Sequence, residues 1–366
     1  MASEPSKTVL MIMVDALRHD FITDDDAPFL YELAKRGACG ALVPPFGFEP
    51  DAAYLAGLDP DQCNGGAQYW RKPGDRLFYL TSLFRLLHLV PLPRWRRLVR
   101  HALRLTAQVM SPNALTRHMA SSAQIPLDIL EQFSTPMTNL ACDPGFAPTP
   151  TVFDALRARG GQWYFHGYPA YKVHTADVVE RYLSEECGGN DLAYLFFGDL
   201  DGVGHRRGPR SVARRDQLRM LDAGLRRIYE HARVNYEVVD LLVFGDHGMV
   251  DVTRHVDMRQ TIRKANLNRR NATYFLDSTM ARFWTADADR RKRLLNLLSK
   301  QDGGHVLSDA ECKQHRIRYP HNYFGDIIFA VEDGALIHPS FYEAESAPKG
   351  MHGYLPGCRD NESAFV

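Results

Sequence analysis

The sequence predicts an α/β fold, a three-layer sandwich with a central and mainly parallel sheet. Two observations support this prediction. The first is a set of continuous apolar runs, which are typical of strands buried on both faces. These runs are residues 8–14 (TVLMIMV), 192–197 (LAYLFF) and 238–244 (VVDLLVF). The second observation is that stretches with helical spacing separate the runs, because strands that alternate with helices favour a parallel sheet covered by helices.

The remaining elements of the predicted sandwich follow the same alternation. Shorter strands are expected at residues 41–43 and 163–166. The helix at 51–57 should stop at Gly57, since glycine commonly ends a helix. Helical spacing is found at residues 26–36, 51–57, 152–159, 175–183 and 211–232.

Two segments interrupt this pattern and suggest a division of the chain. We predict that residues 1–254 form a core, within which 60–145 are a helical and partly basic insertion. Residues 255–345, with a polar helix at 288–298 and strands at 273–276 and 326–331, are predicted to be a cap-like insertion, and 346–366 to return to the core.

The insertion at 60–145 holds helical stretches at 77–89 and 94–105. The second stretch is basic and amphipathic. It is either a binding face for acidic ligands or a membrane surface, or simply a solvated face.

Composition narrows the class of protein. The chain has 366 residues, and its 44 Lys and Arg balance 44 Asp and Glu, so no net charge points to nucleic acid. The N-terminus lacks the pattern of a signal peptide, and the apolar run at 9–14 is too short to span a bilayer. Six cysteines without a CxxC pair indicate reduced thiols. We therefore expect a cytoplasmic protein with no transmembrane segment, and its oligomeric state is left open.

Acidic and histidine side chains gather at the ends of the predicted strands. Asp15 ends the first strand, and Asp201 and His205 follow the 192–197 strand in a glycine-containing turn. Asp246 and His247 follow the 238–244 strand, and the late segment 349–354 (KGMHGY) adds His352. Because the carboxyl ends of parallel strands meet at one crevice, these side chains are expected to converge there. Each of them alone also has an ordinary structural explanation, such as a helix cap.

The order of these motifs resembles the type I phosphodiesterase and nucleotide pyrophosphatase branch of the alkaline phosphatase superfamily. The resembling motifs are an Asp after the first strand, D-x3-H, D-H-G-M and a late G-x-H-G-Y. Residues 56–60 (AGLDP) are similar to the family's TG-x-x-P turn, and 150–153 (PTVF) to its P-T-[VI]-W helix start. The resemblance covers residues 8–57, 148–250 and 349–354, and it implies an alkaline phosphatase-like fold with inserted cap segments.

The resemblance also implies two metal sites. One would use Asp201, His205 and His352, and the other Asp15, Asp246 and His247. Mixed Asp and His ligands suit Zn²⁺, with Mn²⁺ as the second choice. Two such ions about 4 Å apart can hold a phosphoryl group and stabilise its leaving oxygen. The expected activity is hydrolysis of a small-molecule phosphate ester, phosphodiester or phosphoanhydride.

The sequence departs from the family at the nucleophile. The family carries a Thr or Ser in the turn after the second strand, but residues 44–54 (PPFGFEPDAAY) contain no Ser, Thr or Cys. Glu49 and Asp51 are the nearest candidates. In one interpretation Glu49 takes that position as a metal ligand and activated water attacks. In another, Glu49 or Asp51 is itself the nucleophile. In a third, phosphatase chemistry is lost. Asp51 has the further alternative of capping the following helix.

Two arginines are candidates for substrate contacts. Arg18 follows Asp15 in the first turn after the strand, and Arg206 follows His205 directly. A guanidinium matches the oxygens of a phosphate group, although a surface role is open for both. Cleavage of a sulfate or phosphonate at the same site is the alternative activity, and a metal-loaded binding protein without turnover is the alternative from a different class.

Overall fold

The computed structural model describes residues 6–48, 50–63, 65–72, 125–126, 129–135, 139–167, 173–267, 272–343 and 346–366. Three sequence predictions lie outside these residues. They are the helical stretches at 77–89 and 94–105 and the candidate residue Glu49.

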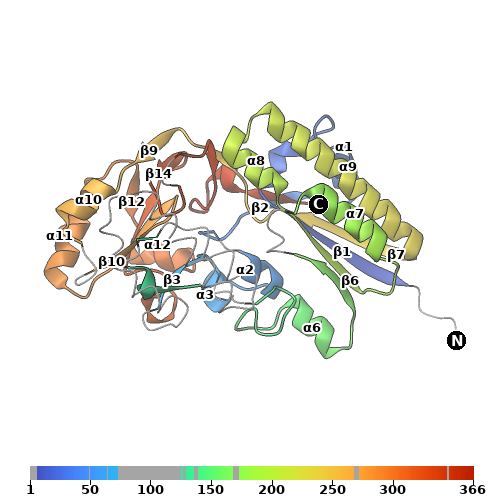
Figure 1. The fold of residues 1–366 in the computed structure, drawn as a ribbon, viewed down its shortest axis with the longest axis horizontal. Coiled ribbons are helices and arrows are strands. Elements are labelled where there is room, and N and C mark those ends of the chain that lie inside the picture. Colours follow the sequence, from blue (N-terminus) through green and yellow to red (C-terminus); the bar gives the residue numbers. More distant parts are fainter. Residues whose placement is uncertain are drawn as a thin grey trace, which may run out of the picture.

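A six-stranded sheet forms the larger lobe (Figure 1). Its strand order is β2-β16-β7-β1-β6-β5, and β1 pairs in parallel with both β6 and β7. β5 pairs in parallel with β6, whereas β16 is antiparallel to β2 and β7. The predicted mainly parallel sheet is therefore confirmed. The strands are β1 (Lys7–Val14), β2 (Gly40–Leu42), β5 (Trp163–His166), β6 (Leu192–Phe197), β7 (Val238–Phe244) and β16 (Ser363–Phe365).

Helices cover both faces of this sheet, which makes it the middle layer of a sandwich (Figure 1). On one face, Leu10 and Ile12 of β1 share a buried cluster with Leu30, Val178 and Leu218, which come from α1 (Pro28–Arg36), α7 (Thr175–Glu185) and α9 (Val212–Asn235). On the other face, Met13 of β1 and Tyr194 of β6 share a cluster with α2 (Asp51–Ala56) and α6 (Val152–Ala158). Successive residues of a strand point to opposite faces, so β1 and β6 each contribute to both clusters.

Local signals in the sequence explain where these helices begin and end. Thr151 caps α6 in a capping box with Asp154, and each residue's side chain accepts from the other's backbone N–H. Gly57 ends α2 as predicted, with a left-handed φ of 65° that glycine adopts without strain. Asp222 of α9 accepts from the backbone N–H groups of Phe29 and Leu30 at 2.9 Å, so the long helix holds the start of α1.

An antiparallel four-stranded sheet forms the smaller lobe, with strand order β10-β11-β13-β12. Its strands are β10 (Thr273–Leu276), β11 (Met280–Trp284), β12 (Gly304–Val306) and β13 (Ile327–Val331), and its helices are α10 (Arg259–Lys264), α11 (Ala288–Leu298) and α12 (Asp309–Gln314). The predicted domain limits at residues 254 and 345 stay a prediction. The return of the chain to the large sheet is seen directly, because β16 joins that sheet.

Short elements complete the described fold. The pair β9–β14 is parallel, and the pairs β8–β15 and β3–β4 are antiparallel. These strands are β3 (Trp70–Arg71), β4 (Phe133–Ser134), β8 (Val250–Asp251), β9 (Arg254–Val256), β14 (Ala335–Ile337) and β15 (Gly350–Met351). The other described elements are the helices α3 (Pro60–Cys63) and α8 (Asp199–Arg207) and the 3-10 turns His19–Phe21, Leu130–Gln132, Pro320–Asn322 and Arg359–Asn361. No helix in the described ranges has the length and apolar character that a bilayer crossing requires. All six cysteines lie in described ranges and are free.

Candidate active site

The predicted site residues converge at one edge of the large sheet. Asp15 directly follows β1, and Asp246 and His247 follow β7 after Gly245. α8 begins two residues after β6, and His352 directly follows β15. Because β1, β6 and β7 are parallel neighbours, their carboxyl ends bring these residues to the same crevice, as the sequence predicted.

Asp201 and His205 lie on a helix, which corrects the turn predicted for this segment. α8 spans both residues, and their spacing of four places them one above the other on one helix face. His205 Nε2 lies 3.0 Å from Asp201 Oδ1. The glycines that suggested a turn serve close packing instead, because a Cβ at Gly204 would lie 3.1 Å from the side chain of Met249.

The ligand atoms of these side chains form two overlapping groups. Asp201, His205 and His352 make one, and Asp15, Asp201 and His247 make the other, each with its atoms within 4.8 Å of one another. The first group has the composition predicted for one metal. In the second, Asp201 stands where Asp246 was expected, although Asp246 Oδ2 lies 3.5 Å from His247 Nε2. Asp201 is therefore shared by both groups.

Backbone carbonyls orient two of the histidines. Nδ1 of His205 lies 2.8 Å from the Gly350 oxygen, and Nδ1 of His247 lies 2.8 Å from the Gly248 oxygen. If each Nδ1 donates its proton there, each Nε2 keeps a lone pair that faces the carboxylates. This is the arrangement that usually holds a metal-binding imidazole.

Buried polar atoms in the cluster lack hydrogen-bond partners. Within the described residues, Asp15 Oδ1, Asp201 Oδ1 and His352 Nδ1 make no hydrogen bond of good geometry, although His247 Nε2 lies 3.3 Å from Asp15 Oδ1 and His205 Nε2 lies 3.0 Å from Asp201 Oδ1. The rings of His247 and His352 also stack with centroids 3.5 Å apart. Buried polar groups are normally satisfied, so this set of oxygen and nitrogen donors fits a bound divalent cation.

The charges in the cluster oppose one another. Burial, and then the neighbouring Asp246, raises the pKa of Asp15 well above its usual range. Burial also works to raise the pKa of Asp201, but His205 and the other histidines lower it overall. Burial disfavours the charged form of His205, yet Asp201 raises its pKa to about 9. Burial and His247 hold the pKa of His352 well below its ordinary value.

The cluster lines a cleft of about 690 Å³. Asp51 and Arg206, both predicted site residues, line the same cleft. Asp51 does not cap its helix, because Pro50 is the N-cap residue of α2 and no side chain makes a cap hydrogen bond. Burial, followed by the charge of Asp246, raises the pKa of Asp51 to about 7.

The raised pKa of Asp51 predicts a pH dependence of stability in the presence of a chelator. Between pH 3.8 and about 7 the folded protein keeps a proton on Asp51 that the unfolded chain has lost. Stability therefore falls as pH rises through this window, by about 4 kcal/mol for a shift of this size. Urea unfolding across the window should show a smaller fall in Asp51→Asn than in the unmodified protein. Equal falls in both proteins would contradict the assignment.

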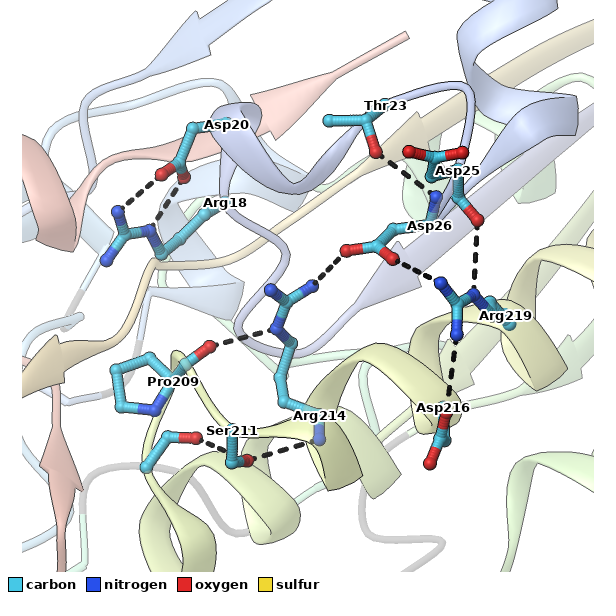
Figure 2. Close-up of polar contacts among 11 residues, drawn as sticks. Arg18, Asp20, Thr23, Asp25, Asp26, Pro209, Ser211, Arg214, Asp216 and Arg219 are labelled. Atoms are coloured by element: carbon cyan, nitrogen blue, oxygen red, sulfur yellow. Dashed lines mark hydrogen bonds and ion pairs between the residues drawn. The ribbon is translucent and has the colours of Figure 1, made fainter.

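Arg18 lies elsewhere, contrary to its predicted contact with substrate. Its side chain is 3% exposed and is absent from the lining of the cleft. Its guanidinium donates to both Asp20 oxygens, to Asp360 and to the Met249 carbonyl, and Figure 2 shows the pairing with Asp20. Arg18 is therefore occupied in fixing the loop after β1.

A neighbouring ion network fixes the other end of that loop. Asp26 accepts from Arg214 and Arg219 of α9, at 3.4 and 3.0 Å (Figure 2). Together with Arg18, these contacts anchor the segment that carries the chain from Asp15 into α1. The arginines near the first strand thus support the site without entering it.

Comparison with known proteins places this arrangement in a family. The sequence profile described as type I phosphodiesterase / nucleotide pyrophosphatase matches residues 9–355. The chain belongs to this family. The resemblance seen in the motifs is thereby confirmed. The family is a branch of the alkaline phosphatase superfamily.

Individual relatives of this phosphodiesterase family match more locally or more distantly. Human ectonucleotide pyrophosphatase/phosphodiesterase family member 7 is 35% identical over 80 residues, which are 21% of this chain and only 17% of that relative. The structure is similar to human ectonucleotide pyrophosphatase/phosphodiesterase 5, with a TM-score of 0.67, 15% identity, and coverage of 98% of this chain and 87% of that one.

A bacterial structure is about equally similar. Phosphonoacetate hydrolase from Sinorhizobium meliloti 1021, in complex with phosphonoformate, gives a TM-score of 0.64 at 15% identity, with coverage of 99% and 90%. At such identities these two structures show the shared fold. The predicted α/β sandwich of the alkaline phosphatase type is thus confirmed.

The cleft of this phosphodiesterase family member has a second wall that sequence reasoning missed. Gln68, Ser278, Tyr342 and Glu343 also line it. Ser278 lies between β10 and β11, and Tyr342 and Glu343 follow β14, so these residues come from the part of the chain that carried no motif. Nothing in their spacing marks them, because they meet the metal-ligand cluster only through the packing of the two lobes.

Proposed function

We propose that the protein is a metal-dependent hydrolase that cleaves a phosphate ester, phosphodiester or phosphoanhydride. The observation that supports this most strongly is the cluster of buried and partly unsatisfied Asp and His atoms at the carboxyl edge of the sheet. Membership of the phosphodiesterase family supports the same class of substrate.

In this proposal Asp201, His205 and His352 hold one divalent ion, and Asp15, Asp246 and His247 hold the other, with Zn²⁺ preferred and Mn²⁺ as the alternative. When bound, such ions supply positive charge that stabilises phosphoryl oxygens. Gly350 and Gly248 keep the two imidazoles in orientation through their carbonyl oxygens. Arg206, which lines the cleft, adds a positive charge that attracts an anionic substrate.

Water is the proposed attacking group. The usual Thr or Ser is missing, because residues 44–54 contain no hydroxyl other than that of Tyr54. Tyr54 donates its hydroxyl proton to the Asp246 carbonyl at 2.7 Å, and burial raises its pKa, so it stays protonated.

Glu49 keeps its predicted role at the nucleophile position, as a metal ligand. Asp51 lines the cleft that contains the Asp and His cluster.

A substrate panel tests this proposal. The protein is stripped with a chelator, reloaded with Zn²⁺ or Mn²⁺, and assayed on nitrophenyl esters of phosphate, phosphodiester, phosphonate and sulfate, and on a nucleotide pyrophosphate. Nucleotides and phosphonates belong in the panel because one similar structure holds AMP and another is a phosphonoacetate hydrolase.

We expect turnover of a phosphate-type ester that requires the metal. Cleavage of the sulfate or phosphonate ester alone would instead support the alternative activity, a sulfate- or phosphonate-cleaving enzyme. Metal binding without turnover of any substrate would support the other alternative, a metal-loaded binding protein that is not an enzyme.

A further inference from the structure

The second wall of the cleft presents hydrogen-bond acceptors to the substrate. Glu343 Oε2 accepts from the hydroxyl of Ser278 at 2.7 Å and from that of Ser340 at 2.9 Å. Both serine protons are thus directed to the same carboxylate oxygen. In the described chain, Glu343 Oε1 has no hydrogen-bond donor and no cationic side chain pairs with this carboxylate. The Glu343 charge acts on His205 and helps to raise the pKa of that imidazole, but no side chain within the described residues forms an ion pair with this carboxylate.

Gln68 adds a neutral acceptor to this wall. Its Oε1 is shielded from solvent and has no hydrogen-bond partner within the described residues. Leaving a buried acceptor without a donor costs about 1–3 kcal/mol, so a ligand donor that meets this oxygen when the Gln68 amide turns toward the cleft would be favoured. Both Gln68 and Glu343 line the cleft that contains the Asp and His cluster.

A single buried ion pair holds both parts of the wall. Arg282 and Asp277 are fully buried and pair at 2.7 Å. Asp277 precedes Ser278, which donates to Glu343, and Arg282 also donates to the carbonyl of Tyr69, which follows Gln68. The two acceptors are therefore attached to a rigid support rather than to freely moving surface chains.

Aromatic rings stand beside these acceptors. Phe48 and Tyr342 also line the cleft, with ring centroids 6.3 Å apart. Ring faces attract cations, and the attraction strengthens when water is excluded. Carboxylate, amide oxygen and aromatic rings together are complementary to a cation that also carries N–H donors.

We propose that Glu343 recognises a primary ammonium group on the substrate, so that the cleft takes phosphodiesters with an aminoalkyl ester group. This inference rests on the proposed function, with the phosphoryl group at the Asp and His cluster and the aminoalkyl group at the second wall. A primary ammonium donates N–H to Glu343 and Gln68. A quaternary ammonium has the same charge but offers no donor to either acceptor.

Matched substrates test the proposal on the metal-loaded protein. Three phosphodiesters share a 4-nitrophenyl leaving group and carry 2-aminoethyl, ethyl or 2-(trimethylammonio)ethyl as the other ester group. A charge-assisted hydrogen bond predicts a kcat/KM about 30-fold higher for the aminoethyl ester than for the ethyl ester. The preference should fall to within about threefold in Glu343→Gln, which keeps the shape of the side chain and removes its charge.

Glu332→Gln is the matched control, since Glu332 is an exposed carboxylate beside β13 that pairs with Arg254. It should keep the full preference. Equal rates on aminoethyl and ethyl esters would overturn the inference while leaving the hydrolase intact. A trimethylammonio ester that reacts as well as the aminoethyl ester would also overturn it. Absence of turnover on all three esters, together with inactivity across the wider panel, would instead remove the proposed function.

Discussion

Asp201→Asn is expected to lower turnover of the preferred phosphate ester by at least about 10³-fold, because metal stabilisation of a phosphoryl group is worth several kcal/mol. Asp201 belongs to both candidate ligand groups, and its Oδ1 lies 3.0 Å from His205 and 3.8 Å from His352. Asparagine keeps the volume but loses the charge that both groups share. Initial rates after reloading with Zn²⁺, with circular dichroism to verify folding, give the measurement.

Asp240→Asn is the matched control for this substitution. Asp240 lies on β7 of the same sheet, but its side chain is 57% exposed and pairs with Lys7. It should retain the rate of the unmodified protein. A folded Asp201→Asn protein that works within tenfold of that rate would show that the shared carboxylate is not needed for the reaction.

Arg282→Met is expected to cost about 3–5 kcal/mol of unfolding free energy, because it leaves a buried charge without its partner. Arg282 and Asp277 are both 0% exposed. Arg282 also donates to the Tyr69 carbonyl at 2.9 Å, and its guanidinium lies 4.8 Å from the centre of the Phe275 ring. Urea unfolding of the purified variant measures this loss.

The double variant Arg282→Met with Asp277→Leu should recover part of that loss, since it removes both charges. Arg227→Met is the exposed comparison. Arg227 pairs with Glu180 at 2.6 Å on the surface, and such pairs contribute little. A loss in Arg282→Met no larger than that in Arg227→Met would contradict the role given to the buried pair.

Regular elements of the fold could be predicted because burial imposes a simple pattern on them. β6 and β7 have the predicted bounds. β6 is buried on both faces, as its continuous apolar run predicted, but the burial predicted for β7 is wrong on one face, where Val238, Asp240 and Leu242 are exposed. The convergence of Asp15, Asp246 and His247 could be expected for a similar reason, because the carboxyl ends of parallel strands share one edge.

The sequence predictions were wrong or incomplete where packing between distant segments determines the position of a residue. Gly202 and Gly204 suggested a turn, but the second lets α8 approach Met249 and Gly350 closely, and the helix continues through both. Arg18 looked like a phosphate ligand by its position after Asp15, yet Asp360, more than three hundred residues later, takes its guanidinium. Glu343 and Gln68 face the cleft only because the smaller lobe packs there.

The central claim is that this Asp and His cluster holds two metal ions. Anomalous diffraction at the zinc edge, from crystals of the full chain grown with Zn²⁺, tests it most directly. We expect two peaks, one beside Asp201, His205 and His352 and the other beside Asp15, Asp246 and His247. A protein that hydrolyses its phosphate ester but shows no anomalous peak in this cleft would contradict the claim.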